Sequence, residues 1–171
     1  MSILENYPKP VLNILMNSLS THDTERAITA LGGEPSIGHD RLWQAERQEL
    51  APHQYAAGKA KFLLCCVLQF TMVGTPCIYY GDEIGMVGYM DPFNRWCFQW
   101  EKRDEDIFQH VKALGEMRKE YRELFAEAEF LPVSFTDSIC CYLRVKGKEA
   151  VFVAVNRSSA TCQLPKLAEF Q

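Results

Sequence analysis

The fold of this chain is decided by the stretch GTPCIYYGDEIGM, which spans residues 74–86. Its centre, Cys77-Ile78-Tyr79-Tyr80, is β-branched and aromatic, and glycines stand on both sides of it. A short apolar run between turn residues is typical of a buried strand. We therefore predict a strand near residues 76–80, followed by a loop that opens with two adjacent carboxylates.

A long helix is predicted before this strand, over about residues 54–72. Five apolar residues recur there at the spacing that lines one helical face: Phe62, Leu63, Cys66, Val67 and Phe70. Further upstream, Gly32-Gly33-Glu34-Pro35 and Pro52 bracket a mostly polar segment around Trp43. We interpret that segment as an irregular excursion that contains a short helix.

The run from Val11 to Met16 is apolar and ends in polar residues 17–23, as a buried parallel strand does when it emerges into a loop. We expect two parallel, adjacent strands, near residues 12–18 and 76–80, joined by a right-handed helical crossover. Downstream, Asp104 can cap a helix whose apolar face reaches Leu124. Strand, helix, strand, helix is the α/β signature.

An antiparallel unit is predicted from about residue 130. Ile139–Val145 and Ala150–Val155 alternate in character, and Lys146-Gly147-Lys148 suits a hairpin turn between them. We therefore divide the chain into an α/β portion, residues 1–128, and the beginning of an antiparallel β domain, residues 129–171.

Composition excludes several classes of partner. With 171 residues, a net charge of −4 and a pI near 5.6, the chain has no basic stripe that could replace phosphate counterions, so nucleic acid is not expected. The longest apolar stretch, Phe62 to Val73, is interrupted by Gln69 and is too short to cross about 30 Å of hydrocarbon. No membrane association is expected, and residues 1–5 show no secretory signal.

The seven cysteines do not read as a disulfide framework. Their number is odd, and two adjacent pairs, Cys65-Cys66 and Cys140-Cys141, cannot easily bridge each other. We expect buried thiols in a reducing compartment, hence a cytoplasmic protein. No metal site and no cofactor are expected.

Three segments could carry chemistry. The first, Ser20 to Arg26, follows the first strand and contains His22 and Asp23. In parallel α/β folds functional groups collect at that end of the strands. Alternatively, Asp23 is a helix N-cap and His22 a loop histidine.

The second segment carries Asp82 and Glu83. Adjacent residues in an extended chain point to opposite faces, so the two cannot both flank one glycosidic bond at the spacing of about 5 Å that retaining enzymes use. We expect a structural role for at least one of them. The third segment, Asp91 to Trp96, combines a carboxylate, a guanidinium and an indole, which suit sugars. Alternatively, Asp91 and Arg95 form a salt bridge that holds a loop.

In their order along the chain, these segments resemble the α-amylase superfamily of glycoside hydrolases. Residues 16–26 look like the region around the seventh barrel strand, residues 74–86 like the eighth, and residues 91–95 like the loop that follows in the neopullulanase and cyclomaltodextrinase branch. The similarity covers residues 7 to about 156. It implies the C-terminal part of a (β/α)8 barrel followed by a β-sandwich.

The resemblance also implies roles. Asp23 matches the carboxylate that stabilises the transition state, His22 a hydrogen-bonding neighbour, and Asp91 and Arg95 donor-side sugar contacts. It implies an α-glucan oligosaccharide as the ligand. The family's nucleophile and acid/base lie on strands four and five, so this chain is expected to lack them and to be inactive alone.

The sequence is also compatible with two other functions. One is a non-catalytic accessory domain of amylase shape, and the other is a carbohydrate-binding module. Because a quarter of a barrel leaves strand edges and apolar faces uncovered, we also expect self-association.

Overall fold

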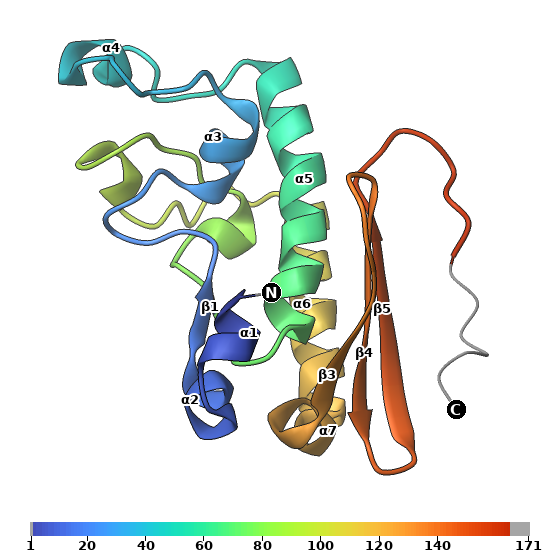
Figure 1. The fold of residues 1–171 in the computed structure, drawn as a ribbon. Helices are drawn as coiled ribbons and strands as arrows, with labels where there is room; N and C mark the ends of the chain where they lie inside the picture. The colour runs from blue at the N-terminus through green and yellow to red at the C-terminus, as the bar shows by residue number, and fades with distance from the viewer. Residues whose placement is uncertain (1, 165–171) are drawn as a thin grey trace.

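The computed structural model describes residues 2–164 and places one long helix, α5 (Pro52–Thr71), at the centre of the molecule (Figure 1). A parallel two-stranded sheet with its loops lies on one side of α5, and an antiparallel three-stranded sheet lies on the other (Figure 1). The remaining helices are α1 (Ser2–Asn6), α2 (Lys9–Ile14), α3 (Ala27–Gly32), α4 (Arg41–Ala45), α6 (Glu105–Glu120), α7 (Arg122–Glu127) and the short 3₁₀ helices η1 (Asp82–Ile84) and η2 (Phe93–Arg95). The strands are β1 (Met16–Ser18), β2 (Thr75–Cys77), β3 (Glu129–Phe135), β4 (Ile139–Lys146) and β5 (Glu149–Asn156).

The two strands of the first sheet are parallel and adjacent, as predicted. Met16 lies opposite Thr75, and Ser18 lies opposite Cys77. The predicted bounds of the first strand are wrong, because residues 9–14 form helix α2. Pro8 and Pro10 explain this. The N–H groups in the first turn of a helix have no partner within the helix, so the missing N–H of proline costs nothing there, and the fixed φ of proline suits a helix start.

The second strand is also shorter than predicted. Strand β2 ends at Cys77, level with the end of its partner at Ser18. The next residues turn to pack around a buried cation: the Arg26 guanidinium lies 4.7 Å from the ring centre of Tyr79 and 4.9 Å from that of Tyr80. Tyr79 and Tyr80, which were expected to extend the strand, therefore connect the loop after β2 to the loop after β1.

Helix α5 forms where the apolar spacing predicts it, and it packs against α3 and α6. Its buried residues Phe62, Cys66 and Phe70 join a core with residues of both helices, among them Ile28 and Ile107. Asp104 caps α6 as predicted, accepting a hydrogen bond from the Ile107 N–H at 3.2 Å. The helix ends at Glu120 rather than continuing to residue 124, and α7 begins at Arg122.

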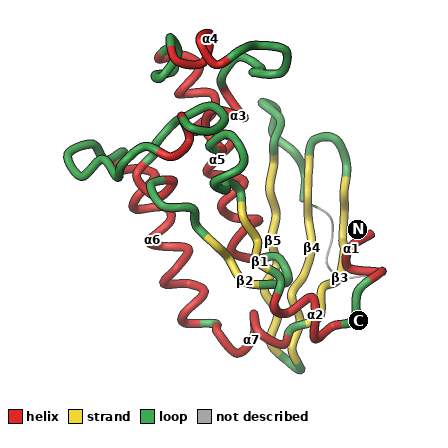
Figure 2. Tube along the Cα trace, turned by 90° about the vertical axis from the view of Figure 1, so that its left-hand side faces the viewer, coloured by secondary structure: helices red, strands yellow, loops and turns green. Residues whose placement is uncertain are grey.

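The antiparallel sheet has the strand order β3-β4-β5 (Figure 2). The predicted hairpin joins β4 to β5, and Gly147 lies in its turn at a φ of +61°. A bulge interrupts β3 between Pro132 and Ser134. Proline cannot donate to a ladder, which explains an irregularity on this edge strand.

A buried arginine ties this sheet to the helices. The guanidinium of Arg144 donates to the carbonyl oxygens of Thr71 at 2.8 Å, Phe125 at 3.0 Å and Ala128 at 3.2 Å. Burial, together with the nearby charge of Arg118, lowers the pKa of Arg144 to about 10, so the side chain remains charged at neutral pH. The ends of α5 and α7 thereby gain partners for carbonyl groups that helix ends leave free.

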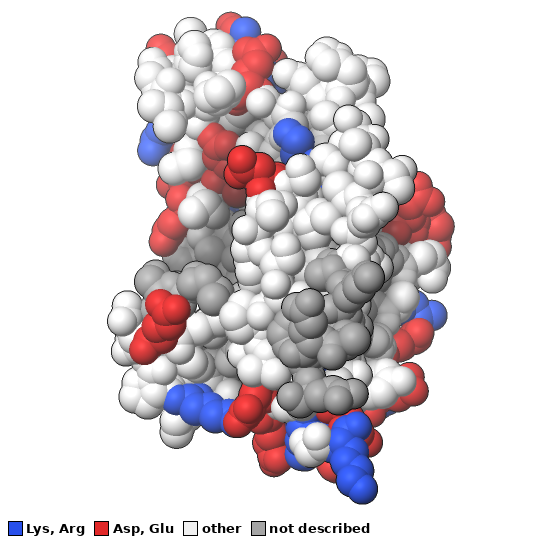
Figure 3. Space-filling view, turned by 45° about the vertical axis from the view of Figure 1, so that its right-hand side comes forward, with Lys and Arg blue, Asp and Glu red and all other residues white. Residues whose placement is uncertain are grey.

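Within residues 2–164, which include every cysteine, all seven are free thiols. Cys66 and Cys141 are buried and Cys97 is exposed, so the expectation of buried thiols is wrong for Cys97. No helix of the described part of the chain has the length and apolarity of a membrane span. On the face shown in Figure 3, basic and acidic side chains are interspersed toward the edges.

Candidate functional site

The loop after β1 carries His22 and Asp23 to the C-terminal end of the parallel strand pair. The N–H of Thr21 donates to Thr24 Oγ1 at 3.0 Å, and the N–H of Asp23 donates to Thr21 Oγ1 at 3.2 Å. These bonds make a tight turn with His22 and Asp23 at its tip. Their side chains are 69% and 71% exposed, so both are open to a ligand.

The helix-cap interpretation of Asp23 is wrong. The N-cap of α3 is Arg26, and the Ser20 hydroxyl accepts the hydrogen bond from the free N–H of Ala27 at 2.8 Å. The carboxylate of Asp23 faces other side chains: its Oδ2 lies 3.2 Å from His22 Nε2, and its Oδ1 lies 3.5 Å from Arg95 Nη2.

Arg95 brings all four predicted site residues together. Its Nε lies 3.1 Å from Asp91 Oδ1 and donates to the His22 carbonyl oxygen at 2.9 Å, while Nη2 faces Asp23. The side chains of Arg95 and Asp91 are each 44% exposed. Exposed ion pairs stabilise a fold only slightly, so these charges contribute little to folding and remain available to a polar ligand.

Asn94 positions this cluster, although it is not among the site residues predicted from the sequence. Its side chain is fully buried, and Nδ2 donates to the carbonyl oxygens of Thr21 at 3.3 Å, His22 at 2.8 Å and Thr24 at 2.7 Å. Adjacent residues of η2 therefore divide two tasks: Asn94 holds the loop from beneath, and Arg95 contacts the exposed carboxylates. The sequence feature that could have indicated this role is the position of Asn94 beside the charged residues of the third segment. An asparagine amide can donate hydrogen bonds to several carbonyl groups.

Arg26 joins the loops after both strands. Its fully buried guanidinium donates through Nη1 to the Tyr80 carbonyl oxygen at 2.8 Å and to Asp82 Oδ1 at 3.1 Å. Gly81, between these two partners, has a φ of +87°, and a Cβ there would lie 2.2 Å from Met86 Sδ. Only glycine fits this turn without strain.

Asp82 and Glu83 lie in different surroundings, as their adjacency predicts. Asp82 is buried against Arg26, which gives it the structural role expected for at least one of the two. Burial raises the pKa of Asp82 to about 6, although hydrogen bonds with Ser20 and Arg26 work in the opposite direction. Among the described residues, Glu83 Oε2 is buried without a hydrogen-bond partner.

The described residues contain no group of three or more His, Cys, Asp or Glu side chains placed to hold a metal ion. The four side chains of the candidate site can act on a ligand through charge and hydrogen bonds. A fixed, exposed carboxylate beside an imidazole and a guanidinium can accept hydrogen bonds from hydroxyl groups and can stabilise positive charge that develops on a bound molecule.

Comparisons with known proteins all point to one protein family. The pattern of the α-amylase catalytic domain matches residues 2–132. A cyclomaltodextrinase of Geobacillus thermopakistaniensis (strain MAS1) is 35% identical over 168 residues, which cover 96% of this chain and 24% of the relative. Neopullulanase 2 of Thermoactinomyces vulgaris is 36% identical over 114 residues, which cover 66% of this chain and 15% of that protein.

A solved cyclomaltodextrinase structure superposes with a TM-score of 0.71 at 29% identity, covering 93% of this chain and 24% of that one. The chain thus spans about a quarter of the length of these two cyclomaltodextrinases. The family match over residues 2–132, together with these similarities, shows that the chain belongs to the α-amylase family, in the branch that includes cyclomaltodextrinases and neopullulanases.

Proposed function

We propose that this chain is the C-terminal part of a retaining glycoside hydrolase that cleaves α-glucosidic bonds in maltooligosaccharides, cyclodextrins or related α-glucans. Strands β1 and β2 would be the seventh and eighth of its barrel, and residues 129–171 would begin its C-terminal β domain. The observation that carries this proposal is the contact among His22, Asp23, Asp91 and Arg95 at the C-terminal end of two parallel strands.

In this proposal Asp23 stabilises the transition state. Positive charge develops on the sugar during cleavage, and a fixed carboxylate nearby lowers the energy of that charged state more than that of the neutral substrate. His22 hydrogen-bonds hydroxyl groups of the same sugar. Asp91 and Arg95 bind a sugar farther from the reacting bond, where contacts are similar in ground and transition states.

Hydrolysis by this route needs two further carboxyl groups, a nucleophile and an acid/base, about 5 Å apart. We propose that these groups belong to other parts of the whole enzyme, on its fourth and fifth strands. The uncovered surface is consistent with this: Ile14, at the end of α2, is 75% exposed, and Met16, the first residue of β1, is 71% exposed. In the described part of the chain β1 pairs only with β2, so one edge of each strand is open.

The test replaces the matching segment of the Geobacillus cyclomaltodextrinase with this chain and measures sugar release from cyclodextrin. The chimera is expected to hydrolyse cyclodextrin, while the 171-residue chain alone releases no reducing sugar above buffer rates. A folded chimera without activity, or turnover by the chain alone that Asp23→Ala abolishes, would contradict the proposal. Light scattering on the chain alone should show self-association through the open edges, and a clean monomer at high concentration would contradict that part.

A further inference from the structure

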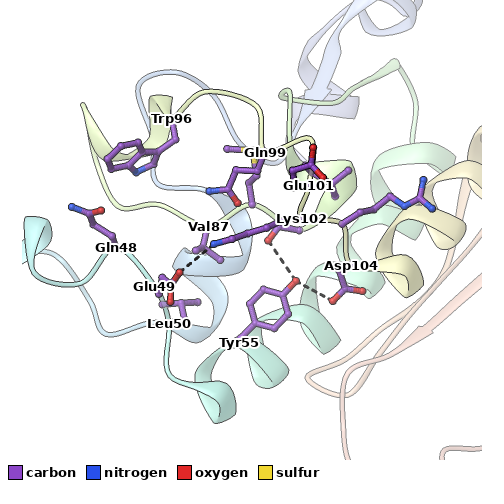
Figure 4. Close-up of a pocket in the computed structure, with 14 residues that line it drawn as sticks. Gln48, Glu49, Leu50, Tyr55, Val87, Trp96, Gln99, Glu101, Lys102 and Asp104 are labelled. Atoms are coloured by element: carbon purple, nitrogen blue, oxygen red, sulfur yellow. Dashed lines mark hydrogen bonds and ion pairs between the residues drawn. The ribbon is translucent and has the colours of Figure 1, made fainter.

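A hollow lies beside the first turn of α5 and the loop that precedes α6 (Figure 4). It has a volume of about 680 Å³ and lies between residues 48–50, which precede α5, and residues 96–104. None of the four candidate site residues lines it. Its volume is in the range of small-molecule pockets, about 300–1,000 Å³.

The floor of this pocket is fixed by side chains from α5 and from the N-terminus of α6. The Tyr55 hydroxyl donates to Asp104 Oδ2 at 3.0 Å, and Lys59 Nζ lies 2.7 Å from Asp104 Oδ1. Gly85 closes the floor at a φ of +84°, and a Cβ there would lie 2.4 Å from Tyr55 Oη. The pocket is therefore preformed at its base.

The walls offer an aromatic ring and many hydrogen-bonding groups. Trp96 is 41% exposed, and its backbone is held by the Tyr80 hydroxyl, which donates to the Trp96 carbonyl oxygen at 2.8 Å. Gln48 and Gln99 also line the hollow (Figure 4). Lys102 Nζ reaches across to Glu49 Oε1 at 3.4 Å.

The charges of the lining nearly balance. The lining contains three acidic side chains, Glu49, Glu101 and Asp104, and two basic ones, Lys102 and Arg103. Such a lining neither concentrates anions nor excludes them. It matches a neutral molecule with many hydroxyl groups, which can accept hydrogen bonds from the cations, donate to the carboxylates and place an apolar ring face on the indole.

We propose that this pocket binds a neutral oligosaccharide as a second site, separate from the cleavage site. Trp96 supplies the stacking surface, and Gln48, Gln99 and Glu49 supply hydrogen bonds to hydroxyl groups. The choice of an α-glucan as the ligand rests on the proposed function, whereas the pocket and its chemistry do not.

The test follows the indole N–H signals of the full 171-residue chain by NMR during titration with maltoheptaose. The chain has three tryptophans, so three indole signals report separate places: Trp43, Trp96 and Trp100. We expect the Trp96 signal to move and saturate. Trp96→Ala should raise the dissociation constant of the pocket about fivefold, as measured on backbone amide signals of residues 99–104, the loss expected for one aromatic contact.

Trp100→Ala is the matched control. Trp100 is 84% exposed in the same loop but does not line the pocket, so its removal should leave the affinity unchanged. An immobile Trp96 signal, or equal losses in the two variants, would overturn the proposal. The two sites are distinguished by their own signals: movement at His22 and Arg95 alone rejects the pocket and leaves the proposed function standing, while movement at Trp96 alone supports the pocket and counts against sugar binding at the candidate site.

Discussion

The buried side-chain nitrogen of Asn94 lies 2.8 Å from the main-chain carbonyl oxygen of His22, although 72 residues separate the two in the sequence. Through this bond and those to Thr21 and Thr24, the loop after β2 sets the position of the loop after β1. The relative position of Asp23 and Arg95 thus depends on a residue that lies beneath both of them.

Asn94→Asp should release the loop of residues 21–24. The substitution keeps the shape of the side chain but places a carboxylate oxygen against three carbonyl oxygens, with a cost on the order of 2–3 kcal/mol. Amide hydrogen exchange of residues 21–24 should accelerate strongly. Asp91→Asn is the matched control, since it changes an exposed carboxylate in the same loop; equal exchange in the two variants would show that Asn94 does not hold the loop.

Gly58→Ala should destabilise the fold, and Gly115→Ala should stabilise it. Both glycines lie inside helices, where alanine is favoured over glycine by about 1 kcal/mol. A Cβ on Gly58, however, would lie 2.4 Å from the carbonyl oxygen of Ile28, whereas a Cβ on Gly115 meets nothing within 4 Å. Urea unfolding of both variants checks this, and a stabilised Gly58→Ala would mean that α3 does not pack closely on α5.

Asp82 should make the fold less stable as pH rises from about 4 to about 6. Burial raises its pKa to about 6, against an unfolded value of about 3.9. The folded state therefore binds more protons in this window, and the free energy of unfolding falls with rising pH, by roughly 3 kcal/mol in total.

The measurement compares urea unfolding of the wild-type chain and Asp82→Asn between pH 4 and 7, because the difference removes contributions from other groups. The variant should lack the downward slope, because a neutral amide does not titrate in this window. Parallel pH profiles for the two proteins would contradict the assignment of this titration to Asp82.

The sequence predicted those features that follow from periodicity over many residues. Helix α5 and the hairpin of β4 and β5 are present because long patterns of apolar residues specify them. The strand expected near residues 12–18 begins only at Met16. A short apolar run does not distinguish a strand from a helical turn, and Pro8 and Pro10 favour helix α2 before it.

The candidate site was predicted less completely. Four site residues were predicted because charged and imidazole side chains in loops often bind ligands: His22, Asp23, Asp91 and Arg95. The structure brings these four into contact. Asn94 could not be found in this way. Its role depends on the direction in which one residue of a single 3₁₀ turn points, and sequence spacing does not fix that direction.

The most direct test of the account is the kcat of the chimeric cyclomaltodextrinase after Asp23→Asn. A neutral amide of the same shape removes charge that acts mainly in the transition state, so kcat should fall about a thousandfold while KM and the fold are retained. Asp91→Ala, the matched control, should raise KM more than it lowers kcat, because a distant sugar contact is similar in ground and transition states. A near wild-type kcat for Asp23→Asn, or a variant that simply unfolds, would contradict the proposed role of Asp23.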